Sequence, residues 1–172
     1  AFVVIALGAW TRLVDAGLGC PDWPGCYGFV FWPNDEVEIA LAESRFPMFP
    51  YDINKAIPEQ VHRLFAAALG LVAILLVYLS FSRTDDKSIK RWSLFLLILI
   101  CCQGLFGYLT VSLNLLPIIV TTHLFGGFAT LTLFYFIFLK SRNFEIFNQI
   151  NISNLKFISA IAFVVLILQI FL

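Results

Sequence analysis

Residues 92–139 decide the fold class, because they contain no Asp, Glu, Lys or Arg. They read WSLFLLILICCQGLFGYLTVSLNLLPIIVTTHLFGGFATLTLFYFIFL. A helix rises about 1.5 Å per residue, so about 20 apolar residues cross a hydrocarbon core of ~30 Å. The run is about twice that length, and it breaks at Asn114-Leu115-Leu116-Pro117, where a proline is placed to open a new helix. The segment therefore predicts two membrane-spanning helices, at 92–113 and 117–139.

Charge-free runs elsewhere extend this pattern. Residues 64–82 and 157–172 also lack charge, and the whole chain is 60% hydrophobic and only 13% charged, against roughly 25% charged in soluble domains. We predict an all-α membrane protein with a four-helix transmembrane bundle: a partial helix at 1–13, then 57–82, 92–113 and 117–139. The zero net charge argues against a nucleic-acid partner.

The predicted organisation is that of a fragment. The chain starts without Met inside one apolar run and stops inside another, so we expect a piece of a longer protein. Residues 1–140 would form an N-terminal half with a long loop at 14–56. Residues 141–156 would be a cytoplasmic linker, and 157–172 the truncated start of a fifth helix.

Loop charges predict the orientation. The short loops at 83–91 and 140–156 are basic, whereas the long loop is acidic. The positive-inside rule then places the short loops in the cytoplasm and the long loop outside, in a bacterial-type cell membrane. Within the long loop, Asn34-Asp35-Glu36 is typical of the start of a short helix through Ala42.

A pair of cysteines lies in the outer loop, in Cys20-Pro21-Asp22-Trp23-Pro24-Gly25-Cys26. On an oxidising side of the membrane, two cysteines so close in the chain favour a disulfide. The bond could be a structural staple or a redox-active pair, and the sequence leaves both open.

The chain has two histidines, and both lie in predicted spans. His62 follows the predicted helix start at Ile57 by five residues, and His123 follows Pro117 by six, so both lie ~8–9 Å below the outer surface. Ionisable groups inside membrane spans are rare and tend to be functional. A matched pair on parallel helices favours axial ligation of one haem iron, and the alternative is polar helix packing.

The neighbours of the histidines support a flat ligand. Small residues follow three or four positions on, on the same helix face: Ala66 after His62, and Gly126 and Gly127 after His123. Such residues would admit a porphyrin.

Three charged residues lie near the same depth. Glu59 precedes His62 by one helical turn, where it would handle a proton or face developing charge, or else pair with Lys55 or Arg63. Arg12 and Arg63 are either anchors at the membrane surface or partners for haem propionates.

Several stretches together resemble the haem A synthase family. They are Gly8-Ala9-Trp10-Thr11-Arg12-Leu13, Gly17-Leu18-Gly19-Cys20-Pro21-Asp22-Trp23-Pro24, Glu59-Gln60-Val61-His62-Arg63, Gln103, Gly107, Thr110-Val111, Leu116-Pro117 and His123-Leu124. The matches keep their order over most of the chain. Trp10 and residues 37–55 depart from the family pattern.

The resemblance implies an eight-helix protein of two similar halves, which oxidises a methyl group of haem O to the formyl group of haem A for terminal oxidases by successive hydroxylations. His62 and His123 would then hold the iron of the substrate haem O, with Glu59 as the catalytic carboxylate. Cys20 and Cys26 match a subgroup with paired loop cysteines. Haem b is expected in the other half. Haem O synthase and terminal oxidase assembly factors are implied partners, beside the lipid bilayer.

Two other functions remain open at this point. A bis-histidine b-type electron-transfer cytochrome would leave its haem chemically unchanged and would not need Glu59. A quinone-linked membrane thiol oxidoreductase would use Cys20 and Cys26, although such proteins usually carry a Cys-x-x-Cys motif and a second outer pair.

Overall fold

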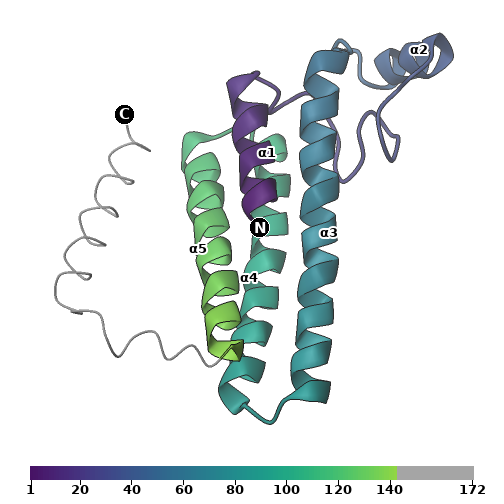
Figure 1. The fold of residues 1–172 in the computed structure, drawn as a ribbon. Helices are drawn as coiled ribbons and strands as arrows, with labels where there is room; N and C mark the ends of the chain where they lie inside the picture. The colour runs from purple at the N-terminus through teal and green to yellow at the C-terminus, as the bar shows by residue number, and fades with distance from the viewer. Residues whose placement is uncertain (143–172) are drawn as a thin grey trace. The chain divides into compact units, whose positions relative to one another are not determined.

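The computed structural model describes residues 1–142, which form five helices joined by turns and one long loop (Figure 1). The helices are α1 (Phe2–Leu13), α2 (Glu36–Arg45), α3 (Ile53–Arg83), α4 (Lys87–Ser112) and α5 (Pro117–Ser141). Most of the predicted linker and all of the predicted fifth helix at 157–172 lie outside the described residues.

Three of these helices are long and apolar enough to cross a membrane by length and composition: α3, α4 and α5. Few of the residues in their apolar stretches are buried within the structure, and a lipid bilayer is the solvent that accommodates such a surface. The chain is therefore an all-α integral membrane protein, as predicted. The helix α1 is also apolar but shorter, with 12 residues.

The chain divides into two compact units, Ala1–Ile137 and Phe138–Leu172. The first unit contains α1 to α4 and most of α5. Of the second unit, the structure describes the end of α5 and Arg142, whose guanidinium lies 5.6 Å from the ring centroid of Phe138.

The capping residues extend the helices beyond the apolar runs. Asp52 accepts a hydrogen bond from the Asn54 N–H at 2.9 Å, and α3 begins at Ile53, four residues before the predicted start. The polar cap of α2 was predicted correctly, since Asp35 accepts from the Glu38 N–H at 2.8 Å. An apolar run marks only the part of a helix that lies in hydrocarbon, whereas the cap stands in the polar flank.

This earlier start changes the position of His62 within its helix. His62 follows the first residue of α3 by nine positions (62 − 53), and His123 follows that of α5 by six (123 − 117). The two histidines are therefore not equally far from the first residues of their helices, and their matched depth in the membrane stays a prediction.

The first unit is held together by α3, which packs against α1 and α4. Near the turn between α3 and α4, the hydroxyl oxygens of Ser80 and Ser93 lie 2.7 Å apart in a buried hydrogen bond. A buried apolar cluster of Leu96, Leu133 and Ile137 joins α4 to α5. The ends of α3 and α5 that lie near the long loop are the ones that carry the histidines (Figure 1).

Candidate functional site

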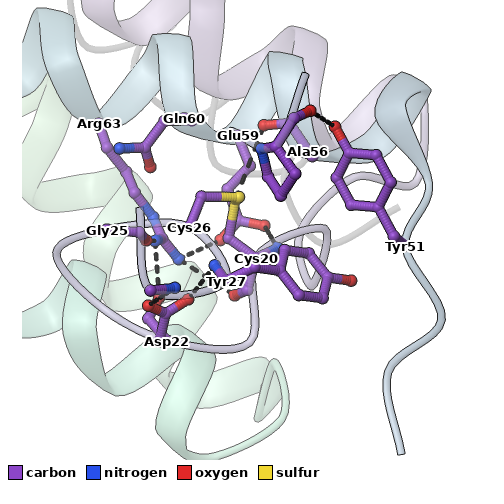
Figure 2. The surroundings of a disulfide bond; sticks show 12 residues. Cys20, Asp22, Gly25, Cys26, Tyr27, Tyr51, Ala56, Glu59, Gln60 and Arg63 are labelled. Carbon is purple, nitrogen blue, oxygen red and sulfur yellow. Dashed lines mark hydrogen bonds and ion pairs between the residues drawn. A yellow bond between two sulfur atoms is a disulfide. The ribbon is translucent and has the colours of Figure 1, made fainter. Parts of the chain in front are cut away.

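One face of α3 holds the loop that the two cysteines close (Figure 2). Cys20 and Cys26 form a disulfide, and both residues are fully buried. The residues of α3 that meet this loop share one helix face by their spacing. They are Ala56, Glu59, Gln60 and Arg63.

Arg63 inserts its guanidinium among the carbonyl groups of the disulfide ring. Its Nη1 donates to the carbonyl oxygens of Asp22, at 2.7 Å, and Gly25, at 2.5 Å. Its Nη2 donates to the carbonyl oxygen of Cys20 at 3.4 Å and to Oε1 of Glu59 at 2.6 Å. The residue therefore binds the loop and the neighbouring carboxylate together.

Glu59 is buried, with 7% of its side chain exposed, and both of its oxygens have partners. Oε1 accepts from Arg63, and Oε2 accepts from the Cys20 backbone N–H at 3.0 Å. Of the two predicted cationic partners, Arg63 is the one observed, because Lys55 pairs with Asp15 at 3.2 Å on the surface. Removing one partner of a buried ion pair typically costs about 3–5 kcal/mol, since it leaves an uncompensated charge.

Two loop-holding residues were not predicted from the sequence. Gln60, 2% exposed, donates from Nε2 to the carbonyl oxygen of Val30 at 2.5 Å. The carboxylate of Asp22 accepts from the N–H groups of Tyr27 and Gly28, at 2.5 and 2.8 Å. An Asp in a Pro- and Gly-rich stretch is a turn signal, and that signal could have identified Asp22.

The interior of the loop is aromatic. Tyr27 lies edge-on to Phe46 and Tyr51, and its hydroxyl donates to the carbonyl oxygen of Pro50 at 3.2 Å. Burial, followed by the neighbouring Tyr51 and Glu59, raises the pKa of Tyr27 to about 12. Because a tyrosine donates this bond only when protonated, the bond persists throughout the physiological pH range.

The two histidines pack on glycines of neighbouring helices. A Cβ atom at Gly8 of α1 would lie 3.0 Å from Cε1 of His62, and one at Gly107 of α4 would lie 3.8 Å from Cε1 of His123. Each ring thus lies in a slot that a side chain on the facing helix would narrow.

The hydrogen bonding of the two imidazoles fits metal ligation. Nδ1 of His62 and Nδ1 of His123 are buried and have no hydrogen-bond partner among residues 1–142. Buried polar atoms ordinarily have a partner, so each ring has a nitrogen left for a ligand.

The remaining predicted residues are more dispersed. Gly126 lies directly against the side chain of Gln103, and a Cβ at Gly127 would lie 3.7 Å from Cγ1 of Ile5. Ala66 is half-buried on α3. In this arrangement the two glycines make room for protein side chains, and the admission of a porphyrin by the three small residues stays a prediction.

Arg12 is exposed at the end of α1, and no ion pair or hydrogen bond of its side chain occurs within the described part of the chain. Its guanidinium is thus available on the loop side of the bundle. Propionate binding by Arg12 remains a prediction.

The start of the loop touches α3 near its first residues and the turn that precedes α5. Gly19 packs directly on the backbone of Lys55 and Ala56 in α3. A Cβ at Gly17 would lie 3.0 Å from Cδ2 of Leu115, in the turn that precedes α5. Two glycines two positions apart therefore let one segment lie against α3 and against the turn that leads into α5.

Comparison with known proteins agrees with this architecture. The model of the COX15-CtaA family, described as cytochrome oxidase assembly protein, matches residues 1–172. The chain belongs to this family. A protein of Shewanella oneidensis named "Heme A synthase" is 40% identical over 171 residues, which cover 99% of this chain and 51% of that protein. A second "Heme A synthase", from Chelativorans sp., is 31% identical over 127 residues, covering 66% of this chain and 35% of that protein. No solved structure matches the chain significantly.

The COX15-CtaA chain described here spans about half the length of the curated relatives it matches. Its resemblance to the haem A synthase family is thus confirmed over its whole length. The two rival functions, a b-type electron-transfer cytochrome and a thiol oxidoreductase, find no support in the names of these relatives.

Proposed function

We propose that the full-length protein is a haem A synthase, which oxidises a methyl group of haem O to the formyl group of haem A by successive hydroxylations. Residues 1–140 would form the N-terminal half that binds haem O, 141–156 a linker, and 157–172 the start of a fifth helix. The observation that carries this proposal is the 40% identity, over nearly the entire chain, to a protein named for that activity. The buried, unpartnered nitrogens of His62 and His123 support it independently.

Each residue of the site has a proposed role. His62 of α3 and His123 of α5 would be the axial ligands of the iron in the substrate haem. Arg12 would pair with a propionate at the loop side. Haem b would reside in the other half of the protein, and haem O synthase and terminal oxidase assembly factors would be partners in delivery and use.

Glu59 is the proposed catalytic carboxylate. It lies one helical turn from His62 on α3 and stays buried. Oxidation of a ring methyl requires that a proton leave or that electron deficiency be stabilised at the ring edge, and a buried carboxylate can do either. Because Arg63 and the Cys20 N–H contact its two oxygens, the carboxylate is held in a fixed position.

Pigment analysis tests the proposed function. The full-length protein would be produced in a host that makes haem O but no haem A, and the extracted haems would be separated and identified by mass. We expect haem A to appear only with the protein present. A protein that carries unaltered haem b or haem O after turnover, with no haem A, would instead be a carrier or a cytochrome.

The topology makes a separate prediction, motivated by the acidic loop and the basic turns. A cysteine at Glu43, which is exposed on α2, should react with a membrane-impermeant maleimide in intact cells. A cysteine at Asp85, exposed in the α3–α4 turn, should react only after the cells are opened. The reverse pattern would contradict the proposed orientation of the loop at 14–56.

A further inference from the structure

We propose that Arg63 is a positioning residue, which joins the ring closed by Cys20 and Cys26 to the Glu59 carboxylate and keeps the two in one arrangement. This inference rests on the proposed function, in which Glu59 acts on the substrate. It assigns Arg63 to the loop rather than to a haem propionate.

The two terminal nitrogens of Arg63 are already occupied by acceptors within the protein. The two terminal nitrogens of a guanidinium bear four hydrogens, and Arg63 has four protein acceptors for them. Only 10% of its side chain is exposed. A propionate could bind these nitrogens only by displacing a carbonyl group of the ring or Glu59.

Most of the acceptors of Arg63 lie in the disulfide-closed ring. Three of them are backbone carbonyls of one short ring, those of Cys20, Asp22 and Gly25. Carbonyl oxygens from a seven-residue segment converge on one group only when the chain curls around it (Figure 2). A planar, forked cation can meet several fixed acceptors at once, whereas the ammonium of lysine acts as a compact point charge.

Cys20 is hydrogen-bonded to both Arg63 and Glu59, so the three residues form a closed set of hydrogen bonds. Its carbonyl oxygen accepts from Arg63 and its N–H donates to Glu59, while Glu59 itself accepts from Arg63. Each group therefore fixes the other two, and the loss of any member loosens both the ring and the carboxylate.

Disulfide protection gives the first test, in the full-length protein. Arg63→Ala and Arg63→Lys should each expose the Cys20–Cys26 bond, so that dithiothreitol reduces it about tenfold faster or more, because reduction depends on access. Lys55→Ala is the matched control: Lys55 lies on the same helix and also pairs with the loop, but at the surface, so the wild-type rate is expected. Both Arg63 variants should keep the low-spin haem spectrum.

Turnover gives the second test and separates positioning from a merely structural role. Arg63→Lys should lower kcat for haem O while KM changes little. Combined with Glu59→Gln, it should add little further loss, because the two changes remove one coupled unit. If the two substitutions lower kcat independently, so that their fold-losses multiply in the double variant, the proposal is overturned.

Other outcomes overturn it as well. If Arg63→Ala weakens haem binding, Arg63→Lys restores it and the disulfide stays protected, Arg63 is a propionate ligand. An unchanged reduction rate in both variants also rejects the loop role.

If Arg63→Ala does not accumulate in membranes, Arg63→Lys and Arg63→Gln replace it, since each keeps a polar head at the ring. Wild-type disulfide protection in either variant counts against the proposal. A wild-type protein that makes no haem A would refute the proposed function, while the reduction rates would still report on Arg63.

Discussion

Replacing either His62 or His123 with alanine in the full-length protein is expected to abolish the low-spin bis-histidine signal of the haem bound by this half. Each imidazole is proposed to supply one of two axial ligands, and alanine supplies none. The loss should be complete rather than partial, and electron paramagnetic resonance together with the haem-to-protein ratio would measure it. Turnover of haem O should disappear with the signal.

Two controls make the histidine prediction specific. Thr122→Ala changes an exposed neighbour of His123 whose hydroxyl donates to the carbonyl oxygen of Ile118 in the same helix, and it should leave the signal intact. Added imidazole should restore a low-spin signal to the alanine variants, because it can occupy the vacated position beside Gly8 or Gly107. If both alanine variants keep the wild-type haem content and signal, the histidine pair does not bind the iron.

Glu59→Gln is expected to lower turnover of haem O by about 10²-fold or more, the usual size of a general-base or electrostatic contribution. Glutamine keeps the size of the side chain but removes its charge. Haem binding should persist, because both histidines remain. The full-length variant should accumulate haem O or a partly oxidised haem and yield little haem A, which extraction and mass analysis would reveal.

The matched control for this change is Glu43→Gln, which neutralises an exposed carboxylate on α2 and should leave turnover unchanged. Because Oε2 of Glu59 also accepts from the Cys20 N–H, glutamine weakens one contact with the loop as well. The disulfide reduction rate therefore has to be measured alongside turnover. Normal haem A production by Glu59→Gln would remove Glu59 from the catalytic assignment.

The charge-free runs of the sequence predicted the three long helices, because the cost of charge in hydrocarbon is a property of each residue by itself. The cap at Asp35 was predictable for a similar reason: the capping bond is local to the chain. The start of α3 was not, since Asp52 and the residues that follow it stand outside the apolar run.

Contacts between segments that are distant in the sequence could not be predicted from residue spacing. Spacing places Glu59 and Arg63 on one helix face, but the three carbonyls that meet Arg63 converge only after the ring at 20–26 has closed. Likewise, spacing places Gly126 on the face of His123, but it does not reveal that Gln103 of α4 lies against it. The chemistry of a residue can thus be predicted where its partners are local, and not where they come from another helix.

The contacts of Gly19 with α3 and of Gly17 with the turn before α5 join segments that are synthesised at different times. At a synthesis rate of about 5–20 residues per second, His123 leaves the ribosome ~3–12 s after His62. During that interval the Leu115 contact of Gly17 cannot form, and only one of the two proposed histidine ligands is present. A haem that needs both imidazoles can load only after α5 has been inserted. If His62 and His123 ligate haem O as proposed, stable loading therefore requires a complete N-terminal half.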